Sequence, residues 1–101
     1  LKELLKDSSS AGNKVPMKFI YSYMQYEPEI SPEDFDICPI LLTQPEKDKW
    51  TPLCLSKPFL DRIKKADMKI SILQDGSHYP VEETALKQLH ENILNFIDEN
   101  L

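Results

Sequence analysis

Two β-rich runs separated by a helical stretch constrain the fold of this chain more than any other feature. Residues 39–43 form a short apolar run, and residues 68–74 form a second run in which Met, Ile and Ile alternate with polar residues. Between the runs, apolar residues recur at helical spacing. Two strands joined by a crossover helix run parallel, so the loops that follow them leave the same edge of the sheet. The sequence therefore predicts a strand–helix–strand unit with both of these loops on one rim.

Each of these loops carries a residue suited to acid–base chemistry. The segment EKDKWTP holds Asp48, and the segment DGSHYPVE holds His78. A carboxylate within reach of an imidazole orients the ring and stabilises its protonated form, which is the acid–base half of a nucleophile–histidine–acid triad. Open α/β sheets carry their sites at this rim. We therefore expect Asp48 and His78 to form a catalytic pair, whereas Ser77 lacks the strand–turn–helix elbow that exposes an attacking hydroxyl.

The two loops resemble the last two strand–helix units of α/β-hydrolase fold enzymes, in which the triad follows the chain order nucleophile, acid, histidine. The resemblance covers residues 36–101 well and the earlier residues weakly. It implies an α/β fold: the C-terminal βαβα portion of that fold, preceded by cap-like helices. Residues 1–37 would form cap or lid-like helices and an acidic connector. Residues 38–101 would form the strand–helix–strand–helix part of the hydrolase core.

The nucleophile of that family has no counterpart in the sequence. No G-x-S-x-G motif occurs, and the only two glycines are Gly12 and Gly76. We therefore expect a C-terminal fragment of a longer carboxylic ester hydrolase, of the serine esterase or lipase type. It would need no cofactor, act on a small ester-like substrate as part of that enzyme, and be inactive alone. An Asp nucleophile, as in dehalogenases and epoxide hydrolases, and a non-catalytic binding or assembly module remain alternatives.

Aromatic side chains supply the candidates for the substrate pocket. Residues 15–24 have the apolar spacing of a short helix. In the resembled family, such helices precede the acid strand and cover the site. Trp50 stands beside the acid loop in the sequence, where it could shape the mouth of the pocket. Plain packing is the alternative interpretation for each of these side chains. The candidates are Phe19, Tyr23, Tyr26 and Trp50.

Composition excludes several classes of function. The net charge is −5 and there is no run of Lys or Arg, which argues against nucleic acid and anionic membrane surfaces as partners. No apolar stretch reaches membrane-spanning length. The carboxylates of residues 25–37 are expected to be solvated rather than to bind a metal. Cys38 and Cys54 are expected to be free, buried thiols, which favours a reducing, cytoplasmic location.

The remaining elements are predicted from their boundary residues. Residues 1–6 have helical spacing, Thr51 is expected to cap a helix that reaches residue 65, and Gly76 is expected to supply an unusual backbone conformation. Residues 81–101 form a terminal helix with an exposed His90. The expected apolar face of this helix contains Leu86, Leu89, Ile93, Phe96 or Ile97, and Leu101. Unpaired strand edges would make the isolated chain self-associate.

Overall fold

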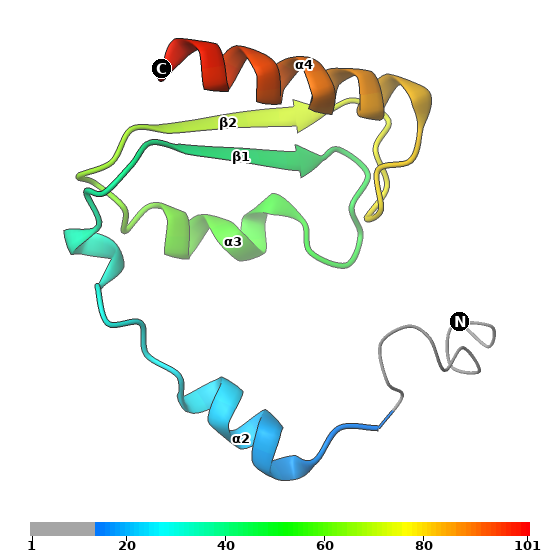
Figure 1. Ribbon diagram of the computed structural model, residues 1–101. Coiled ribbons are helices and arrows are strands. Elements are labelled where there is room, and N and C mark those ends of the chain that lie inside the picture. Colours follow the sequence, from blue (N-terminus) through cyan, green and yellow to red (C-terminus); the bar gives the residue numbers. More distant parts are fainter. Residues whose placement is uncertain (1–13) are drawn as a thin grey trace.

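A computed structural model describes residues 14–101, which form three α-helices, one 3₁₀ turn and two strands (Figure 1). The helix expected at residues 1–6 lies outside the described residues. Along the chain, the elements are α2 (Met17–Gln25), η1 (Pro32–Asp34), β1 (Ile40–Pro45), α3 (Leu53–Leu60), β2 (Met68–Leu73) and α4 (Glu83–Glu99).

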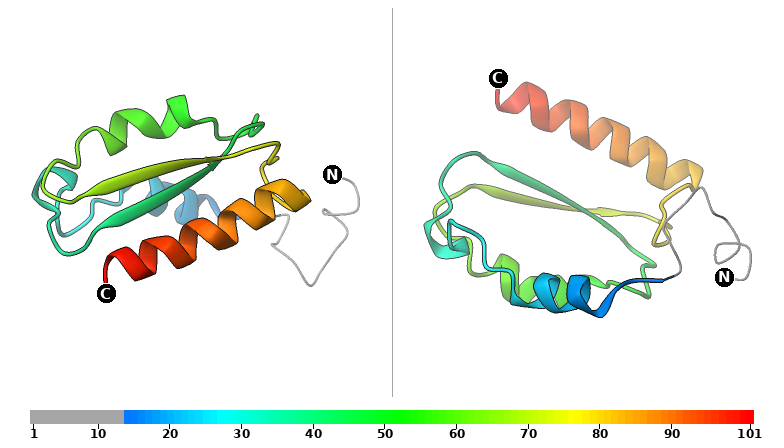
Figure 2. Two further views of the ribbon diagram at one scale, coloured as in Figure 1. Left: turned by 90° about the horizontal axis from the view of Figure 1, so that it is seen from above. Right: turned by 60° about the horizontal axis from the view of Figure 1, so that its bottom comes forward.

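The two strands form a parallel sheet between two helices. Ile40 pairs with Met68 at one end of the ladder and Pro45 with Leu73 at the other. Helix α3 lies on one face of the sheet and α4 on the other, as the views in Figures 1 and 2 show. The predicted α/β class and the parallel strand–helix–strand unit are confirmed. Strand β1 continues two residues beyond its predicted end because Gln44 and Pro45 still pair with residues of β2.

The small core lies between the sheet and α4. Leu73 and Ala85 are the fully buried apolar residues of the described chain, at 1% and 0% exposure. Farther along this face, Asn92 donates a hydrogen bond to Ser71 at 2.6 Å. On the opposite face, Ile70 and Ile72 stay 44% and 43% exposed. Helix α3 therefore covers only part of its face of the sheet.

The predicted apolar face of α4 was partly wrong. The helix begins at Glu83 rather than residue 81, and the side it turns to the sheet carries Ala85 and Asn92. Leu86, Ile93 and Ile97 are 42–48% exposed instead. The small Ala85 permits a close approach to the sheet, and the Asn92 amide finds a polar partner there. The predicted apolar face included no polar residue, so it missed this contact.

Helix α3 differs from its prediction at both ends. Its N-cap is Pro52, which has no side-chain capping bond, so the prediction of a Thr51 cap was wrong. The helix ends at Leu60 rather than residue 65. Its last residues lead into two tight turns, in which the amides of Arg62 and Ile63 bond to the carbonyls of Phe59 and Leu60 at 3.1 and 3.0 Å. Such i→i+3 bonds commonly tighten and end a helix.

Helix α2 lies apart from this core and buries none of its residues. Residues 15–24 were predicted to form it, and Pro16 is its N-cap rather than part of its first turn. The connector after α2 is held by ion pairs: Arg62 binds Glu33, with one contact at 3.1 Å, and Lys65 binds Asp34 at 2.8 Å. These bonds fix η1 against the segment after α3, and they leave α2 without a comparable anchor.

Other expectations have mixed outcomes. Cys38 and Cys54 are free, as predicted, but both are exposed, so their expected burial was wrong. His90 is exposed, as expected. Within residues 14–101, no helix combines the length and apolar character needed to cross a membrane.

Candidate acid–base site

The structure brings Asp48 and His78 into direct contact. Nδ1 of His78 lies 3.0 Å from Oδ2 and 3.1 Å from Oδ1 of Asp48. Asp48 follows β1 and His78 follows β2, so the pair lies at the carboxyl ends of the two parallel strands. The parallel crossover thus accounts for the meeting of two residues that are far apart in sequence. In this geometry, a proton on Nδ1 is donated to the carboxylate.

Backbone hydrogen bonds continue beyond the strands and hold the two loops together. The amide of Glu46 donates to the carbonyl of Leu73 at 2.9 Å, and the amide of Lys47 donates to the carbonyl of Gly76 at 2.8 Å. The side chain of Glu46 returns a bond by accepting from the amide of Asp75 at 2.9 Å. Because these bonds join the loops directly, Asp48 and His78 are placed by one connected piece of backbone.

The tight turn before His78 depends on Asp75 and Gly76 in different ways. The prediction that Gly76 supplies the unusual backbone was wrong, because the left-handed residue is Asp75, with φ of 60°. Asp is one of the few side-chain-bearing residues that tolerate this conformation. Gly76 is needed for space: a Cβ there would lie 3.2 Å from the Ala85 Cβ and 3.3 Å from the Pro45 Cβ. The glycine therefore lets β1, α4 and the histidine loop converge.

The Asp48 carboxylate is buried in a shell of hydrogen-bond donors. Its side chain is 4% exposed. Oδ1 accepts hydrogen bonds from the backbone amides of Trp50 and Thr51, both at 2.9 Å. Oδ2 accepts a hydrogen bond from the Thr51 hydroxyl at 2.8 Å. The Thr51 amide, the His78 ring and the Thr51 hydroxyl hold the pKa of Asp48 far below its ordinary value, against the opposing effect of burial. Asp48 is therefore ionised at neutral pH.

Thr51 and Gln44 support the site, and sequence reasoning missed both roles. Thr51 was assigned to capping α3, but its amide and hydroxyl both bind Asp48. The Gln44 side chain, buried at 8% exposure, donates to the Thr51 carbonyl at 3.1 Å. The D-x-x-T spacing offered a signal for the first role, since short polar side chains commonly bond to amides two or three residues ahead. No local sequence pattern indicated that the Gln44 side chain would be buried.

A cavity of about 360 Å³ lies beside His78. Its lining residues are Lys47, Lys49, Trp50, Ser77, His78 and Tyr79. Of the predicted pocket residues, the structure brings Trp50 to this cavity, and Phe19, Tyr23 and Tyr26 do not line it. The Ser77 hydroxyl donates to the Tyr79 carbonyl at 2.9 Å. Ser77 is thus engaged in the turn.

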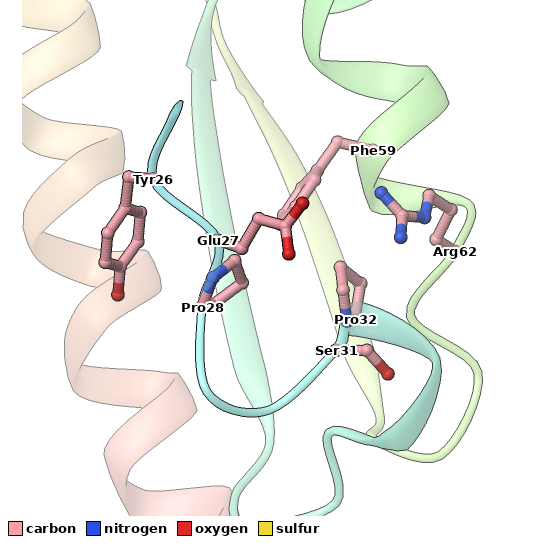
Figure 3. A pocket seen from close by; sticks show the side chains of 7 residues that line it. All are labelled: Tyr26, Glu27, Pro28, Ser31, Pro32, Phe59 and Arg62. Carbon is pink, nitrogen blue, oxygen red and sulfur yellow. The ribbon is translucent and has the colours of Figure 1, made fainter. Parts of the chain in front are cut away.

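Tyr26 instead borders a larger cavity of about 460 Å³ in the acidic connector (Figure 3). Phe59, near the end of α3, and Arg62, in the turn after it, form the opposite wall in this view. This cavity shares no lining residue with the one beside His78. Its only cation, Arg62, is already paired with Glu33. The larger cavity therefore offers no reactive group comparable to the Asp48–His78 pair.

Within residues 14–101, no group of three or more His, Cys, Asp or Glu side chains is arranged to hold a metal ion. Comparisons with known protein families, with curated proteins and with solved structures found no match to this chain. The arrangement itself is an anionic carboxylate bonded to one nitrogen of an imidazole beside an open cavity. Such an arrangement can accept a proton on the other ring nitrogen and stabilise the resulting charge.

Proposed function

We propose that this chain supplies the acid and the base of a catalytic triad in an α/β-hydrolase-type serine hydrolase that cleaves small carboxylic esters. The observation that carries the proposal is the contact between buried, ionised Asp48 and Nδ1 of His78, at 3.0 Å. The position of this pair at the carboxyl ends of parallel strands supports it further. We place the nucleophile in polypeptide outside these residues, which leaves the isolated chain inactive.

The contact determines what each residue would do. Asp48 occupies the Nδ1 side of the ring, and no hydrogen bond from residues 14–101 engages Nε2. His78 would therefore accept the proton of the attacking serine at Nε2 and return it to the leaving alkoxide. Asp48 would hold the Nδ1–H tautomer and stabilise the imidazolium formed between these two steps. If the nucleophile is instead an aspartate, the same pair would activate water to release the bound intermediate.

Covalent labelling tests this proposal in a protein that contains the chain together with its nucleophile. A serine-directed fluorophosphonate should label the wild type, and His78→Ala should lose labelling because the serine is no longer deprotonated. His90→Ala is the matched control and should be labelled at the wild-type rate. Ester hydrolysis without labelling would indicate an aspartate nucleophile. Undiminished labelling of His78→Ala would refute the role of this histidine.

The tautomer of His78 can be tested in the 101-residue chain itself. Nitrogen-15 chemical shifts distinguish Nδ1–H from Nε2–H imidazole, and the wild type should show the Nδ1–H form. In Asp48→Asn, the amides of Trp50 and Thr51 should retain the side-chain oxygen at the Oδ1 position. The new NH₂ group would then face Nδ1 and favour the Nε2–H form. His90 provides an internal reference, and an unchanged tautomer of His78 would count against the pair.

Self-association of the isolated chain forms part of the same proposal. In the described chain, both outer edges of the two-stranded sheet are unpaired, and Ile70 and Ile72 remain almost half exposed. Parallel sheets normally have both faces covered. Sedimentation should therefore show association that rises with concentration, and a stable monomer at all concentrations would contradict this part.

A further inference from the structure

Three aromatic rings surround the reactive end of the site. The ring centroids of Trp50 and His78 are 4.7 Å apart, with planes tilted by 35°. The centroids of His78 and Tyr79 are 4.9 Å apart, and those of Trp50 and Tyr79 are 6.4 Å apart. In both pairs the ring planes make an angle of 77°. All three separations lie within the range of attractive aromatic contacts. The imidazole therefore meets the indole in a tilted stack and the phenol edge to face.

We propose that Trp50 and Tyr79 are positioning residues for His78: together they fix the plane of its imidazole, and the indole face of Trp50 stabilises its protonated form. The catalytic part of this inference rests on the proposed function, whereas the ring contacts can be tested without it. Hydrogen bonds to Asp48 fix only the Nδ1 end of the ring. The two flanking rings would limit rocking about that end and so keep Nε2 in place.

Backbone bonds hold both flanking residues in position, although their side chains are largely exposed, at 63% for Trp50 and 66% for Tyr79. The Trp50 amide donates to Oδ1 of Asp48, so one carboxylate binds both the backbone of Trp50 and the imidazole. The Tyr79 carbonyl accepts from the Ser77 hydroxyl and from the Val81 amide, at 2.9 and 2.7 Å. Two large rings thus stand at the surface because the turn geometry places them there.

The groups around the His78 ring support a role for Trp50 in stabilising the imidazolium. A cation within about 6 Å of an indole centroid is attracted by the electron-rich ring face, and tryptophan is the strongest partner for this contact. Asp48 acts in the same direction. Lys47 and Lys49 line the cavity and oppose a further positive charge, although Lys47 is paired with Asp75 at 2.6 Å. Among the groups that face His78, Asp48 and Trp50 are therefore the ones that favour its charged state.

The contact can be measured directly, because Trp50 is the only tryptophan of the chain. A protonated imidazole in contact with an indole quenches the indole fluorescence. The fluorescence of the wild type should fall as the pH is lowered from about 8 to about 5, the range in which histidines gain a proton. His78→Gln should abolish this fall, and His90→Gln should retain it. A fall that persists in His78→Gln, or its absence from the wild type, would overturn the ring contact.

Activity of the hydrolase that contains this chain tests the catalytic part. Trp50→Leu and Tyr79→Leu should each lower kcat about two- to fivefold, as expected for a cation–π or aromatic contact at an exposed site. Trp50→Phe and Tyr79→Phe should restore most of the loss because a ring is retained. Equal denaturation midpoints would show that the variants are folded. Wild-type kcat in both Leu variants, or no rescue by Phe, would refute the positioning role.

The two proposals fail in distinguishable ways. If the wild type resists the phosphonate and hydrolyses no ester while His78-dependent quenching persists, the triad is refuted and the ring contact stands. If labelling depends on His78 but the fluorescence does not respond to it, the triad stands and the aromatic positioning is refuted.

Discussion

The rim that carries Asp48 and His78 and the N-terminal helix α2 were both predicted to contribute to one site, and they differ in how they are held. On the rim, the Asp48 carboxylate is 4% exposed and accepts hydrogen bonds from three donors besides the imidazole. Backbone hydrogen bonds also join the two loops. Helix α2 buries no residue, and Tyr23 on it is 75% exposed. A local pattern is enough to specify a helix, but a site needs bonds between distant parts of the chain.

The largest expected difference between these regions is in catalysis. In the proposed hydrolase that would include this chain, His78→Ala or Asp48→Asn should lower kcat by about 10⁴, the scale of triad substitutions elsewhere. The loss follows from removal of the base in the first variant and from the wrong tautomer in the second. Steady-state ester hydrolysis measures it. A loss of less than tenfold in either variant would place the chemistry elsewhere.

The next largest difference is in stability. Leu73→Ala should lower the free energy of unfolding by about 2–5 kcal/mol because the side chain is fully buried against α4. Met24→Ala, at a position that is 74% exposed in α2, should change it by no more than about 0.5 kcal/mol. Urea denaturation of both variants gives the comparison. Equal losses would mean that α2 is packed as tightly as the core.

Gly76→Ala tests the convergence of the loops. A Cβ at this position would lie 3.2 Å from both the Ala85 Cβ and the Leu73 carbonyl oxygen, so overpacking should cost about 1–3 kcal/mol. The double variant Gly76→Ala, Ala85→Gly should recover part of this loss because it removes one of the three close contacts. Denaturation of the single and double variants measures the coupling. A neutral Gly76→Ala would show that the turn can move without cost.

Acid sensitivity provides a smaller contrast. The pKa of Asp48 is lower in the folded chain than in the unfolded chain, so its contribution to stability is fully present above the ordinary value of about 3.9. That contribution is lost as the pH falls through the folded value. The difference in unfolding free energy between the wild type and Asp48→Asn should therefore shrink between about pH 5 and pH 2. Asp98→Asn, in α4, should show no comparable change, and a constant difference for Asp48→Asn would contradict the lowered pKa.

The smallest effect is expected at the predicted cap wall. Phe19 and Tyr23 stack on one another at 6.3 Å and are 58% and 75% exposed. Tyr23→Ala should change stability by less than about 0.5 kcal/mol. Its effect on KM separates the two interpretations of these rings: an unchanged KM would favour simple surface packing, and a several-fold increase would support a cap wall. Trp50→Leu, on the rim, is the matched aromatic substitution for comparison.

Local sequence signals located the helices and strands of residues 14–101 but not their contacts. The β-rich runs and the turn residues identified β1 and β2, and the crossover rule gave their direction. The same signals misassigned Thr51 to a helix cap and Gly76 to a left-handed turn. Those errors have different causes. The partner of Thr51 is Asp48, three residues earlier, which is a local contact, whereas Gly76 meets Ala85 and Pro45 only when α4 and the sheet come together.

The sequence by itself determined a parallel strand–helix–strand unit and the side on which Asp48 and His78 emerge, because chain direction and crossover handedness follow from local geometry. Only the tertiary structure decided that Asp48 is buried among the Trp50 and Thr51 amides, and that two aromatic rings flank the imidazole. Hydrogen-bond lengths and ring contacts depend on how loops from two strands are joined in space. Residue patterns along one segment do not contain that information.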